Sequence, residues 1–423
     1  MRARARKSPG SSLLLAAGDI HGRAVWLLLA CLVAQMGIGS NYTISVLAPA
    51  LLEDLGWSRG DYMAALSPRT IVAALASPLV GTLMYRFGAR SILVVGVLLI
   101  GVVFGLYGAI QNLTHVFVLS MGFGLIIAGV GDVVVGTVVS QWIVRARGLA
   151  LGIVYSGSNL GGLVFALLAA RVLEVSDWRT ACVAIGVVAV VVMLPIVFLG
   201  VREPRSEDAP APRVSDVGEP TVSTESVTLT KAIRTESFWL LLFALFVFYF
   251  YYASVTSHFV LFLTDVGMST AAASVSFGLT IFVGVGAKIG IGLFADRFPA
   301  KTALLIDFGV VAAASSMLLV LPEAGILLPV FVVSHGLAVA AQNVVYPLIV
   351  AWCFGVGHMA KIYGVLMLAL LPGGTLGPIF AGYTFELFGN YDFAFRVFVG
   401  LNVLSFLGLC RLRSAQEPTV RLS

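Results

Sequence analysis

Charged side chains are scarce in this sequence. Asp, Glu, Lys and Arg make up 11% of its 423 residues, whereas 59% are hydrophobic and the mean hydropathy is +1.00. A soluble protein carries about a quarter charged residues, so water alone cannot solvate a surface of this composition. The scarcity excludes an ordinary soluble fold. It favours an all-α membrane protein, because lipid requires backbone groups to pair within the chain.

Cysteine is also rare, and the usual signals of catalysis are missing. The four cysteines lie in apolar runs without metal-ligand spacing, so we read them as small buried hydrophobes. No GxxxxGK[ST] loop and no nucleophile–base set occurs. The net charge is +5, but the basic residues are dispersed in short turns rather than gathered on one face, which argues against nucleic acid. We therefore expect no metal, no cofactor and no enzymatic activity.

Long apolar runs are what the sequence does contain. Spans of about 20 apolar residues cross a bilayer, and we count twelve, six on each side of a segment rich in Pro, Ser, Thr, Asp and Glu that is typical of a flexible linker. The prediction is twelve transmembrane helices in two six-helix bundles. The expected order is an N-terminal tail (1–24), a first bundle (25–200), a linker (201–236), a second bundle (237–412) and a C-terminal tail (413–423).

The distribution of Lys and Arg predicts the orientation. If both termini are cytoplasmic, the inner segments hold 20 of the 26 basic residues and the outer turns hold four. Cytoplasmic loops are enriched in Lys and Arg, so we expect both tails and the linker inside. Arginine outnumbers lysine 21 to 5, which favours a bacterial inner membrane.

A short basic turn occurs twice between apolar runs. GTLMYRFGAR begins at Gly81, and GLFADRFPAK begins at Gly292, 211 positions later. The glycine-rich segments at 157–162 and 370–377 also match each other, and small residues there allow helices to approach closely. Two parallel six-helix repeats with a site between them are a secondary transporter architecture.

These turns, the twelve spans and the linker resemble the major facilitator superfamily over residues 25–412. The family's turn looks like G-x-L-x-D-R-x-G-R, and in the first copy Tyr85 stands where the aspartate usually is. The second copy keeps Asp296 and Arg297 but has Pro299 in place of the later glycine. The residues of the first copy that fit are Gly81, Leu83, Arg86, Gly88 and Arg90.

Within that superfamily the sequence looks most similar to the monocarboxylate and oxalate–formate branch. The resemblance implies a proton symporter or anion exchanger for small organic anions. We expect it to act as a monomer among membrane lipids. The alternative is a drug or metabolite exporter, although the G-P pair usual in helix 5 of drug antiporters is missing from 156–162. The stretches that carry the resemblance are 55–62, 140–162, 237–246, 257–269 and 377–395.

Lys288 stands where this branch usually has a carboxylate-binding arginine, four residues before Gly292. The resemblance therefore implies a substrate contact, and a charge in mid-membrane is by itself a functional candidate. The alternative is that Lys288 snorkels toward the inner interface. Some members carry an acid one turn earlier, where this sequence has Gly284.

Arg69 and Asp132 are the other charges within spans. Arg69 is either a second anion contact, a partner of Asp132 or an arginine that reaches the outer headgroups. Asp132 is either a protonatable coupling group, since burial raises a carboxyl pKa, or the structural partner of Arg69. The repeat places Asn343 opposite Asp132. Asp307 and Glu386 are expected to be solvated near span ends.

Uncharged polar residues supply weaker candidates. They line the cavity or make interhelical hydrogen bonds; the sequence leaves both open. His258, near the outer end of its helix, is either a structural donor or a proton-coupling group. The remaining substrate candidates are Asn41, Tyr42, Gln342, Asn343 and Tyr346.

The two basic turns are expected to form a gate rather than to bind substrate. Asp296 is predicted to sit at the positive N-terminus of a helix in the other half. Because Tyr85 removes the matching acid, we predict an asymmetric gate that is weaker on the Tyr85 side. The basic residues expected to add pairs that break on opening are Arg86, Arg90, Arg147, Arg297 and Lys301.

Overall fold

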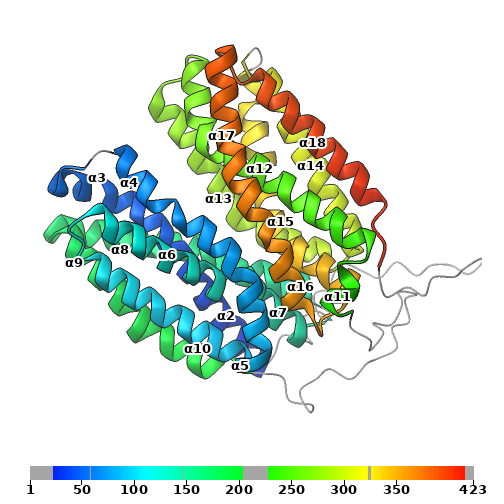
Figure 1. The fold of residues 1–423 in the computed structure, drawn as a ribbon, viewed down its shortest axis with the longest axis horizontal. Helices are drawn as coiled ribbons and strands as arrows, with labels where there is room; N and C mark the ends of the chain where they lie inside the picture. The colour runs from blue at the N-terminus through cyan, green and yellow to red at the C-terminus, as the bar shows by residue number, and fades with distance from the viewer. Residues whose placement is uncertain (1–21, 58, 145, 203–226, 323–324, 415–423) are drawn as a thin grey trace, which may run out of the picture.

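The computed structural model describes residues 22–57, 59–144, 146–202, 227–322 and 325–414 (Figure 1). Within these ranges helix is the only regular secondary structure, and the helices form two bundles that lie side by side. The prediction of an all-α protein built from two bundles is confirmed. The predicted tails lie mostly outside the described residues.

Among the described residues, eleven segments are long and apolar enough to cross a membrane, and one of them is long enough for two spans. The 44 residues of Ala64–Tyr107 would reach about 66 Å as one straight helix, twice the hydrocarbon thickness. Gly88 divides them with φ 80° and ψ 155°, a left-handed conformation that favours glycine because it has no Cβ. With this division, the described part of the chain has the twelve spans that the sequence predicts.

In the first half, several spans are interrupted within the bundle. Extended backbone at Gly131 separates α6 from α7, and a turn at Ser67 separates α4 from α5. Side chains of Asn112 and Asp177 cap α6 and α9 by accepting backbone N–H groups. The elements are α2 (Arg23–Gly39), η1 (Ser40–Tyr42), α3 (Thr43–Leu55), α4 (Arg59–Leu66), α5 (Pro68–Tyr107), α6 (Leu113–Val130), α7 (Asp132–Trp142), α8 (Arg147–Val175), α9 (Trp178–Val188), η2 (Ala189–Met193) and α10 (Leu194–Gly200).

The second half has longer uninterrupted helices. Thr235 and Ser269 cap α12 and α13 through their hydroxyl groups. The elements are α11 (Leu229–Ala232), α12 (Glu236–Asp265), α13 (Thr270–Ala295), α14 (Ala300–Val320), η3 (Gly325–Leu327), α15 (Leu328–Phe354), α16 (Met359–Leu366), η4 (Met367–Ala369), α17 (Leu370–Phe388) and α18 (Asp392–Cys410).

The far end of the predicted linker, residues 227–235, contacts the second half. The backbone N–H of Val227 donates to the carbonyl of Phe354 at 3.0 Å, and Thr228 caps the short helix α11. These bonds dock 227–235 against α15 and α16. Residues 203–226 of the linker lie outside the described residues.

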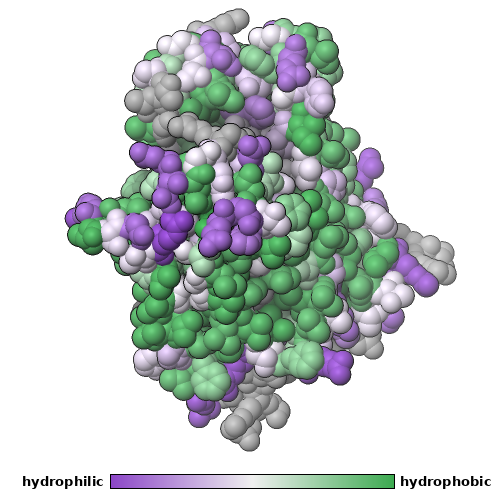
Figure 2. All heavy atoms as spheres, turned by 60° about the vertical axis from the view of Figure 1, so that its left-hand side comes forward, coloured by the Kyte–Doolittle hydropathy of each residue, from purple (hydrophilic) through white to green (hydrophobic). Residues whose placement is uncertain are grey.

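The surface has the polarity that a bilayer requires. Figure 2 shows a broad band of hydrophobic side chains across this face, with hydrophilic side chains gathered above and below the band. Many large apolar side chains are exposed, among them Leu163, Val191 and Leu407. Lipid rather than water solvates such a band.

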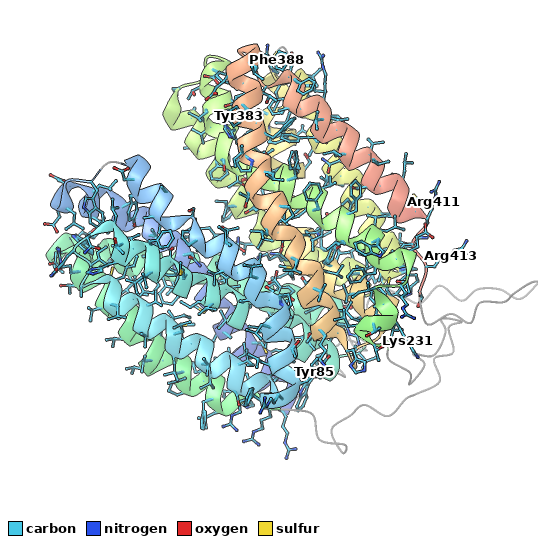
Figure 3. All side chains as sticks on the ribbon, viewed as in Figure 1. Tyr85, Lys231, Tyr383, Phe388, Arg411 and Arg413 are labelled. Atoms are coloured by element: carbon cyan, nitrogen blue, oxygen red, sulfur yellow. The ribbon has the colours of Figure 1, made fainter. Side chains whose placement is uncertain are left out.

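The two halves touch at one end and separate toward the other. Tyr85 and Lys231 mark the end that we call the linker end, and Tyr383 and Phe388 mark the opposite end (Figure 3). Extended contacts between the halves pair α5 with α16 and α17, α8 with α13 and α15, and α7 with α15 and α16. Among the described residues no contact of this extent joins α3, α4 or α9 to the second half, and Figure 1 shows these helices diverging from α13 and α17.

Candidate functional site

The halves approach most closely where α8 passes α13 at the linker end. A Cβ added to Gly148 would collide with the carbonyl oxygen of Gly292, and one added to Gly292 would collide with that of Gly148. Asp296 ends α13 and accepts hydrogen bonds from the N–H groups of Gly148 (2.6 Å) and Leu149 (2.8 Å) in the first turn of α8. The acid therefore lies at a positive helix N-terminus in the other half, as the sequence predicted.

Burial affects the carboxyl of Asp296 as well. Partial desolvation raises the pKa of Asp296, although its two backbone hydrogen bonds and the nearby Arg147 act in the opposite direction. The Asp296 carboxylate is thus hydrogen-bonded to two backbone N–H groups in a partly buried environment that disfavours its negative charge.

The first copy of the turn makes the symmetry-related contact between α5 and α16. A Cβ on Gly81 would collide with the carbonyl of Ala360, 211 positions after Leu149. Tyr85 occupies the place of Asp296, with its hydroxyl facing the backbone N–H groups of Ala360 and Lys361. The Lys361 ammonium lies 5.1 Å from the Tyr85 ring centroid, and the His358 ring lies 6.0 Å away. A neutral phenol replaces the carboxylate here; the relative strength of the two contacts stays a prediction.

The other basic gate candidates do not form ion pairs across the halves within the described ranges. Four of the five meet backbone carbonyls or aromatic rings of their own half, and Arg147 also acts electrostatically on Asp296 of the other half. This corrects the expectation of pairs that break on opening. Arg86 lies over Phe87, Arg90 lies 4.0 Å from the Phe198 ring centroid, Arg147 donates to Ser140 and Ile143, Lys301 donates to Cys410 and Leu412, and Arg297 is exposed.

Lys288 lies deeper on the same pair of helices and is only 4% exposed. Its Nζ donates to the Tyr155 carbonyl (2.9 Å), the Ser158 hydroxyl (2.9 Å) and the Asn159 Oδ1 (2.7 Å), all on α8. An ammonium group has three hydrogens, so all are used. Lys288 reaches across to the other half and does not extend toward a membrane interface, which rules out the snorkelling alternative in this conformation.

Asp132 begins α7 beside the break at Gly131. The Gln35 amide is 3.4 Å from its carboxylate, and the Tyr155 hydroxyl donates to its backbone carbonyl at 3.1 Å. Lys288 is near enough to interact with it electrostatically without forming an ion pair. Asp132 therefore belongs to the Lys288 region.

Arg69 is half-buried near the start of α5, and its charge acts on the phenols of Tyr42, Tyr62 and Tyr107. In the described part of the chain it has no hydrogen bond and no ion pair, so the predicted pairing with Asp132 is absent. The neighbouring Thr70 lies against Gly374 of α17. Arg69 is thus an uncompensated cation close to where the halves begin to separate.

The weaker substrate candidates differ in how exposed their side chains are. Tyr42 is 48% exposed, whereas Gln342 is buried with both amide atoms unpartnered in the described structure. Asn41 of η1 donates to the Ile38 carbonyl near the end of α2. Asn343 is half-buried, and Tyr346 is buried with its hydroxyl bonded to the Leu241 carbonyl, so Tyr346 ties α15 to α12.

His258 lies inside the second half, away from these charges. Its Nδ1 is 3.1 Å from the Tyr391 hydroxyl and its Nε2 is 3.1 Å from the Pro378 carbonyl. An Nε2–H donor and an Nδ1 acceptor satisfy both contacts, which fits a structural histidine. Its proposed coupling role finds no support in this geometry.

Some polar residues were missed or misplaced by the sequence reasoning. Ser158 and Asn159 lie within the glycine-rich segment that the sequence predicts to be a packing face, and their polarity inside this segment is the signal that distinguishes them. Asp307 is 1% exposed with neither oxygen partnered in the described structure, which corrects the expectation of a solvated position.

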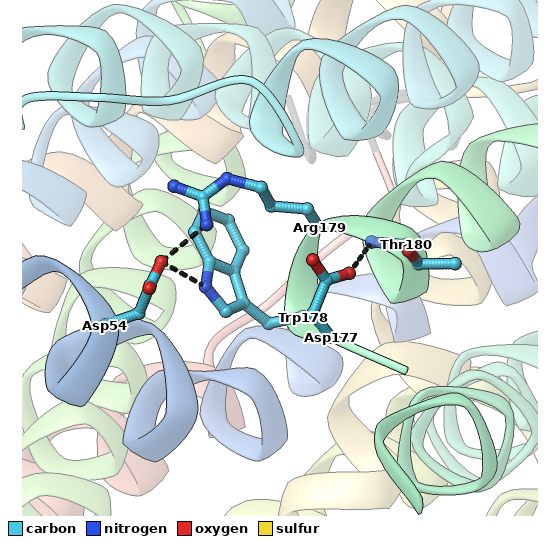
Figure 4. A network of polar contacts seen from close by, with 5 residues as sticks. All are labelled: Asp54, Asp177, Trp178, Arg179 and Thr180. Atoms are coloured by element: carbon cyan, nitrogen blue, oxygen red, sulfur yellow. Dashed lines mark hydrogen bonds and ion pairs between the residues drawn. The ribbon is translucent and has the colours of Figure 1, made fainter. Parts of the chain in front are cut away.

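A further network ties the first half together at the opposite end (Figure 4). Asp54 of α3 accepts from the Trp178 indole (3.1 Å) and the Arg179 guanidinium (2.5 Å), and Arg179 stacks over the Trp178 ring at 4.2 Å. These donors hold the pKa of Asp54 below its usual range. The network fixes α3 to α9 without contacting the second half.

Comparison with protein families and curated sequences places this architecture among known proteins. A family profile described as Major Facilitator Superfamily matches residues 27–353. The chain is 25% identical to human monocarboxylate transporter 11 over 436 aligned positions, covering 95% of this chain and 86% of that protein. It is 24% identical to the oxalate:formate antiporter of Oxalobacter formigenes, covering 86% of each.

Solved structures share the fold at low sequence identity. The human organic anion transporter MFSD10 superposes with a TM-score of 0.72 at 13% identity, covering 95% of this chain and all of that one. The Escherichia coli fucose:proton symporter superposes with a TM-score of 0.69 at 14% identity, covering 93% of this chain and all of that one.

Proposed function

This chain belongs to the Major Facilitator Superfamily of secondary transporters, and from that premise we propose that it carries a small organic anion, with a monocarboxylate as the favoured substrate. The relatives named for monocarboxylates and for oxalate and formate support this substrate class.

The observation that carries the proposal is the pair of central cations. Neither Arg69 nor Lys288 is in an ion pair among the described residues, and Asp132 is the one carboxylate that acts on Lys288. Charges inside a membrane protein are costly unless they are compensated. With Asp132 ionised, these three groups leave one positive charge, which a monovalent organic anion would neutralise.

The mechanism that we propose is alternating access. The linker end is closed by the α8–α13 and α5–α16 contacts, and it carries basic residues such as Lys231, Arg411 and Arg413 (Figure 3). The positive-inside rule makes this end cytoplasmic, so the conformation described here is open to the outside. Rocking one half against the other would expose the same site to the cytoplasm.

Proton coupling is the favoured driving force, with Asp132 as the coupling group. Because Asp132 lies near Lys288, protonation of its carboxylate would remove a negative charge that competes with the substrate anion for Lys288. Exchange of two anions is the alternative, because it requires no titrating group.

Uptake by the purified protein in liposomes tests the proposal. Labelled acetate, formate, lactate and oxalate would be offered with and without an inward pH gradient. We expect saturable uptake of a monocarboxylate that the gradient stimulates. Exclusion of every anion, together with expulsion of a lipophilic cation, would refute the organic-anion assignment.

Two variants assign the roles within the site. Lys288→Ala is expected to abolish uptake while Lys288→Arg retains part of it, and Lys231→Ala, an exposed lysine on α11, is the matched control. Asp132→Asn is expected to transport without stimulation by the pH gradient. If the pH gradient still stimulates transport by Asp132→Asn, Asp132 is not the coupling group, and the proposed anion site is unaffected.

A further inference from the structure

We propose that Lys288 is a substrate-released latch between the two halves, and that Asn159 is the positioning residue that sets its strength. In the empty transporter the ammonium group holds α13 to α8. A bound carboxylate takes over its hydrogen bonds and frees the two helices from each other. Only the release step rests on the proposed function, because it requires an anionic substrate. The hydrogen bonds that form the latch are present without substrate.

The latch follows from the number of donors that Lys288 has. Its three hydrogens are committed to three acceptors at 2.7–2.9 Å, and every acceptor belongs to α8 of the first half. A carboxylate can therefore bind Lys288 only by displacing at least one oxygen of Tyr155, Ser158 or Asn159. Substrate binding and loss of contact between the halves become the same event.

The exchange is favourable because of the charges involved. The present acceptors are a carbonyl, a hydroxyl and an amide, all neutral, whereas hydrogen bonds between two ionised groups are shorter and stronger. A ligand shifts a conformational equilibrium only by its differential affinity for the two states. An anion that binds Lys288 better when α8 has moved away has that differential affinity.

Asn159 makes the latch two-sided. Its Oδ1 accepts from Lys288, and its Nδ2 donates to the Ile281 carbonyl at 3.3 Å, also on α13. The amide lies beside Gly284, 3.7 Å from where a Cβ would stand, which is ordinary van der Waals distance. One side chain of α8 thus contacts α13 through both of its polar atoms.

The latch also differs from the Asp296 contact on the same two helices. Asp296 bonds to backbone N–H groups in the first turn of α8, about 9–17 Å along the helix from the three Lys288 acceptors at 1.5 Å per residue. That contact closes the linker end but is too far away for a small substrate at Lys288 to touch it. Lys288 can therefore contact both the substrate and α8, whereas Asp296 contacts α8 alone.

Double electron–electron resonance on the full-length protein tests the latch directly. Spin labels at Val175→Cys and Leu387→Cys report the separation of the halves at the opposite end, in a Cys410→Ser background that leaves only buried cysteines among the described residues. Without substrate, we expect Asn159→Ala to raise the ratio of short to long distances about tenfold, because a hydrogen bond to a charged group is lost. Ser158→Ala should shift the ratio in the same direction by less.

Ser156→Ala is the matched control, since its hydroxyl bonds to Ile153 of its own helix. Elution as a single species shows that each variant is folded. An Asn159→Ala distribution equal to that of the control would overturn the latch, whatever the transport assays give.

Substrate release is tested by adding acetate, formate, lactate or oxalate to the same labelled proteins. The anion that shifts the wild-type distribution is expected to act at a lower half-maximal concentration in Asn159→Ala, because it has one fewer bond to displace. A higher half-maximal concentration would overturn the competition. If no anion shifts the wild type while Asn159→Ala shifts the empty protein, the latch is supported and the substrate class in the proposed function is wrong.

Discussion

The two closed contacts at the linker end come from corresponding parts of the repeat and differ in the residue that faces the N-terminus of the neighbouring helix. On α8 and α13, glycine meets glycine and Asp296 bonds to the first turn of the facing helix. On α5 and α16, Gly81 makes the same close approach, but Tyr85 takes the place of the acid. The comparison teaches that close packing is shared by both contacts, whereas electrostatic attachment to a helix N-terminus belongs to only one.

The largest expected effect comes from removing what the contacts share. Gly292→Leu would place a side chain against the Gly148 carbonyl. We expect it to prevent the linker end from closing, because neither backbone can make room without separating the two helices. The same spin-label pair should then report only short distances at the opposite end. Gly290→Leu is the control, since nothing lies within 4 Å of a Cβ at that position. Equal distance distributions in the two variants would show that backbone proximity is unimportant.

A smaller effect is expected from the charge that the contacts do not share. Asp296→Asn keeps the size of the side chain but loses the negative charge at the N-terminus of α8. We expect the conformation with a closed linker end to lose about 1–2 kcal/mol of stability. The ratio of short to long distances at the opposite end should therefore rise roughly tenfold. Asp265→Asn, an exposed acid at the opposite end, serves as control. An unchanged ratio would assign the closure to packing alone.

Changes at Tyr85 should make the two contacts more alike. Tyr85→Asp is expected to strengthen the α5–α16 contact several-fold by supplying the carboxylate that the second copy has. Tyr85→Phe should change the ratio less than Asp296→Asn does, because it removes only a neutral hydroxyl group. If Tyr85→Phe proved as damaging as Asp296→Asn, the predicted asymmetry would be wrong.

The smallest effect is expected within one half, at Asp54. Asp54→Asn should lower the melting temperature slightly and leave the distance ratio unchanged, because this network joins α3 to α9 only. Because the folded pKa of Asp54 is lowered, its stabilisation is complete above its unfolded pKa of about 3.9 and lost as the pH falls through the folded value. The melting difference should therefore be present at pH 7 and vanish in acid. A difference that persists in acid would exclude the ion pair as its cause.

The fold could be predicted further than the site. Hydrophobic length and the 211-residue repeat indicate twelve spans in two bundles, and Asp296 is expected at a helix N-terminus because the positive end of a helix favours an acid. The acceptors of Lys288 could not be predicted. They lie about 130 positions away in the sequence, and no local pattern specifies which face of α8 meets α13.

The sequence by itself determined the membrane class, the two halves and the positions of the unpaired charges, because hydrophobicity, repetition and charge are properties of the chain that no contact alters. Only the tertiary structure decided how those charges are used. Lys288 binds α8 rather than a headgroup, Asp132 lies near Lys288 rather than Arg69, and Tyr85 replaces a carboxylate at a helix end. Each of these depends on how separate helices pack, and packing is set by the whole set of contacts rather than by any one segment.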